Sequence, residues 1–364
     1  MPVPVSAKVK DRAAINALKK TFVRQDIIFT TLLFAVLLLF PLLPFVEGWM
    51  AAQAALVVIY IMAAQGVSIL TGYTGLVTVG HGGFLAIGAY TAALLMKYFD
   101  TDIIVGMIAG GMVSAIIGCA LGLVFLRLAG AFMAIGTLGF AFFIGTIVNN
   151  APIFEGREGI SLPPNNVLGY EIGDIGFYYV SVCALAVITL FIYSLIRSGV
   201  GRAFKALRDA EKAAQSSGVN RLLYRTLAFS VSAFITGVAG ALNGLIVNYV
   251  SAEVYADIWY SVDILVATVV GGSAMLMGPF IGGAFVVMLP FFLEELADFS
   301  FIMKGVVLIV VLIFAPAGIA DVLARPFRAW RRYRLEAAAQ TERDRVVATS
   351  AGAQPQPQPE EGGR

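Results

Sequence analysis

The sequence predicts an all-α polytopic membrane protein with about ten transmembrane helices and both termini in the cytoplasm. Apolar residues make up 59% of the 364 positions and charged residues only 13%. A water-soluble protein of this composition would expose far more apolar surface than its polar residues could cover. Apolar runs of about twenty residues recur, which is the length of a helix that crosses a hydrocarbon layer of roughly 30 Å. The third observation is that Lys and Arg are concentrated in the segments that would lie on one side of the membrane.

The apolar runs give the expected positions of the spans. Glycines between Gly72 and Gly83 and between Gly271 and Gly278 weaken helical continuity, so broken or re-entrant helices are alternatives there. The expected spans cover residues 27–46, 50–70, 76–96, 103–126, 131–150, 177–196, 226–247, 261–275, 279–296 and 301–319.

The basic residues predict the orientation. With both termini in the cytoplasm, that side holds 22 of the 25 Lys and Arg residues, mainly before Asp26, from Arg197 to Arg225 and after Ala320. This distribution satisfies the positive-inside rule, which a single added or missing helix would violate. The residues on the outer side are Lys97, Arg157 and Lys304.

Three regions follow from this pattern. Residues 1–26 form a basic cytoplasmic segment, residues 27–323 a transmembrane domain with a long cytoplasmic loop at 197–225, and residues 324–364 a basic juxtamembrane segment and a tail. The tail lacks apolar residues to bury, so we expect it to be disordered. Cys119 and Cys183 fall in separate apolar runs, where we expect buried apolar residues rather than a disulfide or a metal site.

The long cytoplasmic loop is the most informative segment. Between Gly201 and Gly218 it is rich in alanine and charge and lacks proline, which predicts one surface helix that ends near Gly218 and Asn220. A narrow stripe of small residues buries little area and suits a close contact with another protein. The alternative is a connector whose arginines only fix the topology. The stripe comprises Ala203, Ala206, Leu207, Ala210, Ala213 and Ala214.

The same loop resembles a signature of permeases from ABC importers of the branched-chain amino-acid type. GVGRAFKALRDAEKAAQSSGVN is similar to the family pattern GRALRAIRENEIAAEALGIN, which marks a short helix that docks on the ATPase subunit. Other segments resemble the family in the same order, from GYTGLVTVGHGGFLAIGAYTAALL to VVGGSAMLMGPFIGGA and GVVLIVVLIFAPAGIADVL. Of the two permease subunits of such importers, the M-type is the one that this sequence resembles more, and the resemblance covers about residues 50–323.

The resemblance implies a function and a set of partners. The chain would form half of the translocation path for a small solute, branched-chain or other hydrophobic amino acids, in a bacterial inner membrane. Its partners would be a second related permease in a heterodimer, two cytoplasmic ATPase subunits and an extracytoplasmic solute-binding protein, with no nucleic acid. The chain has no GxxxxGK[ST] phosphate loop, so ATP and magnesium are expected on the ATPases and no enzymatic activity here. The alternative is a secondary transporter or a channel for a small polar solute such as urea.

The resemblance also nominates site residues. The ATPase-coupling residues would be Arg202, Ala203, Ala206, Leu207, Arg208, Asp209, Ala210, Glu211, Lys212, Ala213, Ala214, Gln215, Ser216, Ser217, Gly218, Val219 and Asn220. The candidates for the translocation path are Gly72, Tyr73, Gly75, Gly80, His81, Gly271, Gly272 and Gly278.

His81 is the only histidine, which raises the possibility of a pH switch or a proton relay. The predicted neighbouring spans offer no carboxylate at a similar depth, so we favour a role in helix packing or capping. An intramembrane hydrolase built on Ser68 and His81 is disfavoured, because Leu70 stands where the serine elbow needs its second glycine.

Overall fold

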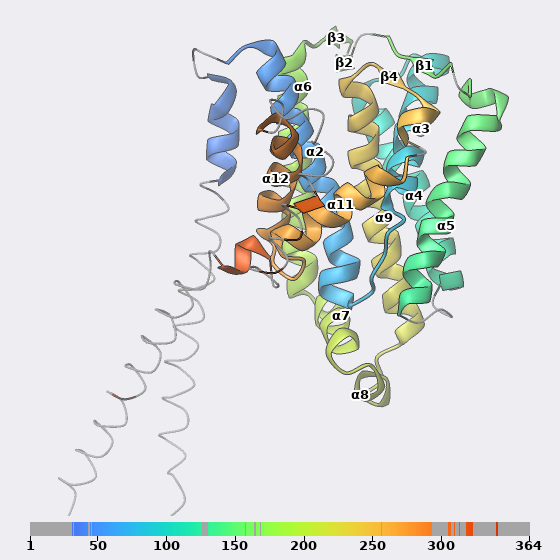
Figure 1. Ribbon diagram of the computed structural model, residues 1–364, viewed down its shortest axis with the longest axis vertical. Helices are drawn as coiled ribbons and strands as arrows, with labels where there is room; N and C mark the ends of the chain where they lie inside the picture. The colour runs from blue at the N-terminus through green and yellow to red at the C-terminus, as the bar shows by residue number, and fades with distance from the viewer. Residues whose placement is uncertain are drawn as a thin grey trace, which may run out of the picture. The chain divides into compact units, whose positions relative to one another are not determined.

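The structure is a computed structural model (Figure 1). It describes residues 31–292 except 32, 43, 45, 126–129, 157, 164, 168 and 256, together with 305–306, 309, 313, 318–322 and 340. One compact unit is Val36–Val322, and a second contains Met1–Ala35 and Leu323–Arg364. The predicted segment 1–26, the tail expected to be disordered from Thr349 and most of the predicted span 301–319 lie outside the described residues.

Helices make up most of the described chain. The longer helices are α2 (Gly48–Ser68), α3 (His81–Phe99), α4 (Ile103–Phe125), α5 (Ala131–Asn150), α6 (Asp174–Arg197), α9 (Arg221–Ile246), α11 (Ile258–Gly271) and α12 (Gly278–Phe292). The shorter ones are η1 (Phe40–Leu42), the π-helical η2 (Ile69–Thr74), η3 (Pro152–Phe154), α7 (Gly199–Asp209), α8 (Glu211–Ser216) and α10 (Ala252–Tyr255).

Six described helices are long and apolar enough to cross a membrane. This finding confirms the all-α membrane class, whereas the number of ten spans and the cytoplasmic termini stay predictions. Three shorter apolar helices cover Leu33–Leu42, Ile258–Gly271 and Gly278–Phe291. The six long ones are Gly48–Thr74, His81–Phe99, Ile103–Phe125, Ala131–Asn150, Asp174–Arg197 and Arg221–Ile246.

Helix α9 is the centre of the unit and packs against α2, α3 and α4. Small residues on α4 recur at every fourth position, so they form one stripe along the helix that faces α9. A Cβ placed on Gly118 would overlap the side chain of Ala233, and one on Gly237 would overlap Ser114. Backbones therefore approach closely here, as small residues allow between membrane helices. The stripe consists of Gly106, Gly110, Ser114, Gly118 and Gly122.

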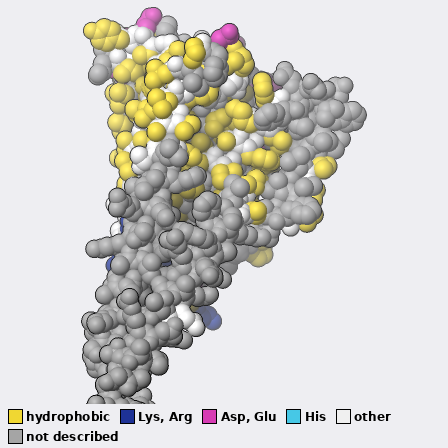
Figure 2. All heavy atoms as spheres, turned by 90° about the vertical axis from the view of Figure 1, so that its left-hand side faces the viewer, with side chains coloured by type: hydrophobic (Ala, Val, Ile, Leu, Met, Phe, Trp, Pro, Cys, Tyr) yellow, Lys and Arg dark blue, Asp and Glu magenta, His cyan; other side chains and the backbone are white. Residues whose placement is uncertain are grey.

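The outer surfaces of α4, α5 and α6 are apolar, with exposed side chains such as Ile116, Phe132 and Leu190. Figure 2 views the molecule from the left-hand side of Figure 1, opposite α4 and α5, and shows apolar side chains gathered on that face as well, with acidic side chains near the top and basic ones lower down. Cys119 and Cys183 are also exposed, so the expectation that both are buried was wrong. Both lie on helices with apolar outer surfaces, where a thiol behaves as a small apolar group.

Short strands and turns cover the end of the unit opposite α7 and α8 (Figure 1). β1 (Ile160–Ser161) pairs antiparallel with β4 (Tyr249–Val250), and β2 (Asn166–Val167) pairs with β3 (Tyr170–Glu171). An ion pair between Lys97 and Glu155 joins the end of α3 to the turn after η3. These contacts hold the long segment between α5 and α6 onto the helices.

Two of the predicted spans are interrupted, as the glycine-rich segments allow. Residues 75–80 are extended rather than helical, so the predicted span 76–96 begins only at His81. In Figure 1 this segment returns from the end of α2 toward the middle of the bundle, where α3 starts. Helices α11 and α12 have 14 and 15 residues and are separated by a turn, and α11 lies across the bundle (Figure 1). The broken form is therefore the one observed.

Candidate functional site

The connector between α6 and α9 folds into two short helices. Ser198 caps α7 by accepting a hydrogen bond from the Val200 amide at 3.2 Å, and Asn220 caps α9 in the same way through the Leu223 amide at 3.1 Å. Ala210 leaves the helical region, with φ −155° and ψ 78°, and divides α7 from α8. The prediction of a single helix from Gly201 to Gly218 was therefore wrong, because a break falls in its middle.

The predicted alanine stripe is divided between the protein interior and the surface, because Ala210 and Ala213 are exposed. Ala203, Leu207 and Ala214 are buried, and α7 packs against α6, η2 and α9. The stripe does not form one continuous outward face, because composition alone does not show which side of a helix is covered. The predicted coupling residues that are exposed are Arg202, Arg208, Asp209, Ala210, Lys212, Ala213, Gln215, Ser216, Ser217, Gly218 and Asn220. Among the remaining predicted coupling residues, Ala206, Glu211 and Val219 are half-buried.

Glu211 anchors α8 to the first turns of α9. Its carboxylate lies 2.9 Å from Arg221 Nε and 2.8 Å from Arg225 Nη2. The Arg225 side chain is only 9% exposed, so this ion pair is partly shielded from water. Gly218 then ends the connector with φ +86°, a conformation that glycine adopts without strain. Both residues therefore fix the position of α8.

Arg208 joins α7 to the end of the second long helix. Its Nη1 donates a hydrogen bond of 2.7 Å to the carbonyl oxygen of Gly72 in η2. Because residues after η2 are extended, this carbonyl is among the last of the helix and has no helical donor. A cation at a helix C-terminus is also favoured by the helix dipole. Lys205 lies on the same side, with Nζ 5.9 Å from the ring centroid of Tyr73.

The two glycine-rich breaks touch each other directly. A Cβ on Gly72 would overlap the carbonyl oxygen of Ser273 in the turn between α11 and α12, and a Cβ on Gly318 would overlap the backbone of Gly272. Within that turn Gly271 and Gly278 are equally close-packed. A continuous series of contacts therefore runs from Arg208 through η2 to the turn.

The start of α3 lies inside the bundle and takes its hydrogen bonds from other helices. Gly80 precedes the helix and has no side chain to cap it. The amide of Val79 instead donates to Thr137 Oγ1 at 3.1 Å, and the amide of Gly82 donates to Ser261 Oγ at 2.9 Å. An interior helix end is tolerated in a membrane only where neighbouring groups satisfy its amides. α5 and α11 supply those groups.

His81 links α3 to α9 and α2 through one hydroxyl. Its Nε2 lies 2.7 Å from Ser232 Oγ, which in turn donates to the carbonyl oxygen of Gly66 at 2.6 Å. Since the Ser232 proton is engaged with Gly66, His81 must donate from Nε2 and is assigned that tautomer. This geometry supports the packing role. The hydroxyl of Ser68 donates to the Gln65 carbonyl oxygen instead.

The eight predicted path residues form packed joints. Gly72 lies against the turn that contains Gly271 and Gly272, whereas Gly80 packs on Thr137 of α5. All eight are buried except Gly75, which has φ +72° and lies beside the Arg208 side chain. The structure thus brings them together in two groups, one at the α11–α12 turn and one at the start of α3.

The structure contains a cluster of tyrosines that the sequence did not predict. The ring centroids of Tyr255 and Tyr260 are 5.7 Å apart, those of Tyr90 and Tyr255 6.3 Å, and those of Tyr60 and Tyr260 6.4 Å. Tyr255 donates to Asn243 Oδ1 at 2.7 Å, and burial raises the pKa of its phenol, which keeps the donor proton in place. The four tyrosines come from α2, α3, α10 and α11, so no local pattern signals the cluster.

The long apolar helices, their broken ends and the connector packed on them define a multi-pass helical membrane protein. The family model described as "Branched-chain amino acid transport system / permease component" matches residues 49–316. The chain belongs to this family.

Curated relatives agree with the family. The chain is 32% identical over 301 residues to the high-affinity branched-chain amino acid transport system permease protein LivM of Salmonella typhimurium, covering 75% of this chain and 70% of the relative. It is 31% identical over 301 residues to LivM of Escherichia coli, with the same coverage. The permease protein LivH of Escherichia coli is 26% identical over 299 residues, which are 73% of this chain and 92% of LivH. No solved structure gives a significant match.

Proposed function

We propose that this chain is the M-type permease subunit of an ATP-binding-cassette importer and forms half of the translocation path for branched-chain or other hydrophobic amino acids. The observation that carries the proposal is the family match over 49–316, together with relatives that are named as branched-chain amino acid permeases. A secondary transporter or a urea channel is not favoured by these relatives.

The α7–α8 connector is the proposed docking element for an ATPase subunit. On this exposed surface the family signature, basic residues and two short helices coincide. Ala210 and Ala213 are exposed there, and small residues permit a close approach of another rigid surface. ATP and magnesium would then bind to that partner, and this chain would not itself hydrolyse ATP.

The other partners follow from the same family. The chain resembles both LivM and LivH, so a second related permease is the proposed partner within the membrane. An external solute-binding protein would deliver the substrate at the end opposite α7 and α8. The proposed location is the bacterial inner membrane, with α7, α8 and both termini in the cytoplasm, because this orientation places most Lys and Arg inside.

We propose that the glycine contacts between η2 and the α11–α12 turn rearrange during transport. Closure of the ATPases would push on α7, and the Arg208 contact with Gly72 would pass the displacement to η2 and the α11–α12 turn. Packed interfaces of this kind favour two discrete arrangements over continuous deformation. The resulting motion would open the path toward one side of the membrane at a time.

Docking can be tested by filling the exposed surface of α8. Ala213→Trp adds bulk at an exposed position, so the protein should insert normally while ATPase subunits no longer co-purify and uptake is lost. Ala120→Trp, at an exposed alanine of α4, is the matched control and should retain both. Normal co-purification with Ala213→Trp would refute docking at this surface. The chain reconstituted alone should give no gradient-driven flux, and such flux would favour the secondary transporter.

A further inference from the structure

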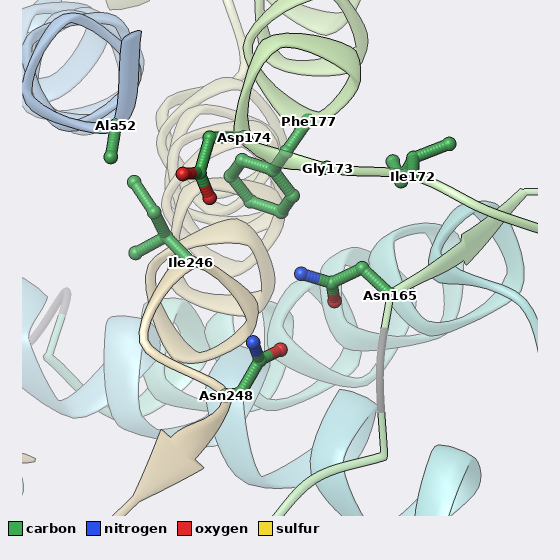
Figure 3. A pocket seen from close by; sticks show the side chains of 8 residues that line it. All are labelled: Ala52, Asn165, Ile172, Gly173, Asp174, Phe177, Ile246 and Asn248. Atoms are coloured by element: carbon green, nitrogen blue, oxygen red, sulfur yellow. The ribbon is translucent and has the colours of Figure 1, made fainter. Parts of the chain in front are cut away.

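A small cavity of about 100 Å³ lies at the end of the unit that carries the β-strands. Its walls come from α2, α6, the end of α9 and the segment that precedes α6, as Figure 3 shows. Apolar and polar side chains alternate around it (Figure 3). The apolar side chains are Ala52, Ile172, Phe177 and Ile246, and the polar ones are Asn165, Asp174 and Asn248.

Asn165 brings a buried acceptor without a donor to this cavity. The residue is only 7% exposed, and its Nδ2 donates to the Leu245 carbonyl oxygen at 3.0 Å. Its Oδ1 has no hydrogen-bond partner among the described residues. Buried polar atoms are nearly always paired, so this oxygen calls for a donor from water or from a ligand.

Asp174 and Asn248 leave further acceptors open. Both are exposed, and within the described part of the chain neither side chain has a hydrogen bond or an ion pair. Asp174 is the first residue of α6, where the helix dipole favours a negative charge. Asn248 has φ 52°, a left-handed conformation that asparagine tolerates, and its side chain points toward Asn165 in Figure 3.

This set of groups matches a cationic donor. Three side chains offer oxygen acceptors and one of them carries a negative charge, whereas no Lys or Arg lines the cavity. The ring of Phe177 adds an aromatic wall, against which a guanidinium or ammonium group is attracted. The cavity volume of about 100 Å³ is several times the roughly 10–15 Å³ that one water molecule requires. The cavity can therefore hold the end of a Lys or Arg side chain.

The surroundings indicate a protein as the source of that cation. The segments 98–102, 151–176 and 248–260 hold eight Asp and Glu residues and one basic residue, Arg157. Such a field attracts a basic protein surface and orients it during encounter. We propose that the cavity receives a Lys or Arg side chain from an external protein that docks on this face. The inference rests on the proposed function, in which that protein is the solute-binding protein.

The charge preference of the cavity can be measured directly. The background is the complete reconstituted transporter in which this chain carries Cys119→Ser, Cys183→Ser and Ile172→Cys, since Ile172 is half-buried and lines the cavity. Trimethylammonium-ethyl and sulfonato-ethyl methanethiosulfonates serve as cationic and anionic probes of the new thiol. Adding Asp174→Asn should slow the cationic probe about fivefold and speed the anionic probe by a similar factor, which is the Coulomb factor for unit charges about 4 Å apart in water. The cation-to-anion rate ratio should therefore fall by about 25-fold.

Two variants control this measurement. Asp174→Glu keeps the charge and should keep the preference, which separates electrostatics from a folding defect. Glu253→Gln removes an exposed acid that does not line the cavity and should change the ratio less than twofold. An equal ratio with Asp and Asn at position 174 would overturn the proposal of a cation site.

The occupant is tested by protection of the same thiol. The substrate-loaded solute-binding protein should slow labelling, and Asp174→Asn should raise the concentration needed for protection about tenfold, as for loss of a charge-assisted hydrogen bond. Protection that follows the phosphatidylethanolamine content of the vesicles, without any protein, would identify a lipid headgroup and overturn the proposal. Normal stimulation of ATP hydrolysis without protection would also overturn it, while leaving the proposed function intact. A binding protein that never stimulates ATP hydrolysis would contradict the proposed function instead.

Discussion

Truncation of Arg208 tests whether α7 is joined mechanically to the end of the α2–η2 helix. Arg208→Ala removes the 2.7 Å hydrogen bond to the Gly72 carbonyl oxygen. A hydrogen bond from a charged group contributes about 1.5–3 kcal/mol. The Arg208 side chain is 33% exposed, so solvent lowers this contribution, and we expect a loss of about 1–2 kcal/mol. This loss corresponds to a factor of roughly 5–30 in the equilibrium between the joined and separated states.

The assay is the number of solute molecules transported per ATP hydrolysed by the complete transporter in liposomes. Arg208→Ala should lower this ratio severalfold while the ATPases remain bound, and Arg208→Lys should be intermediate, because an ammonium keeps the charge but not the planar fork. Lys205→Ala is the matched control, since it removes a charge from the same helix that has only a 5.9 Å ring contact with Tyr73. An unchanged transport-to-ATP ratio in Arg208→Ala would refute the mechanical link.

Three further substitutions test the packing. Gly72→Ala should destabilise the protein by about 2–3 kcal/mol, because the new Cβ overlaps backbone, whereas Gly139→Ala has open space and should be neutral or slightly stabilising in thermal unfolding. Ser232→Ala should destabilise by about 1–3 kcal/mol and should couple with a second change at His81 in a double-mutant cycle; additive effects would contradict the shared hydroxyl. Gly218→Ala should destabilise α8 by about 1 kcal/mol through backbone strain alone, and Gly218→Asn by less, as read by hydrogen exchange; equal protection in both variants would show that φ at this site is not limiting.

The sequence was sufficient for the continuous spans. The predicted span 131–150 coincides with α5, and 103–126 differs from α4 by one residue, because an apolar run bounded by polar residues leaves a helix little freedom in a membrane. Glycine content also indicated where continuity fails, at Gly72–Gly83 and Gly271–Gly278. These features depend on local composition, which can be read directly from the sequence.

The start of α3 and the orientation of the connector depend on distant residues. The extended segment 75–80 is held by Thr137 and Ser261, which are more than fifty positions away, so no local pattern could place the first turn of α3 at His81. The sequence of the alanine stripe is compatible with either an inward or an outward orientation. In the structure α7 packs against α6, η2 and α9, and Ala203 and Leu207 are buried. The contact between Arg208 and Gly72 likewise joins residues that are 136 positions apart.

The glycine contacts around α9 restrict which helices can slide. Gly88 of α3 and Gly240 of α9 bring the backbones of these two helices together. A shift of either helix along its axis would drive the next bulky residue into the backbone of the other helix. We therefore expect helices α3, α4 and α9 to move as one body. Gly271 and Gly278 bring α11 and α12 equally close together, so we expect these two helices to move as a second body against α2 and η2. A disulfide between α4 and α9 would consequently leave transport intact, whereas one that fixes α11 to α2 would stop it.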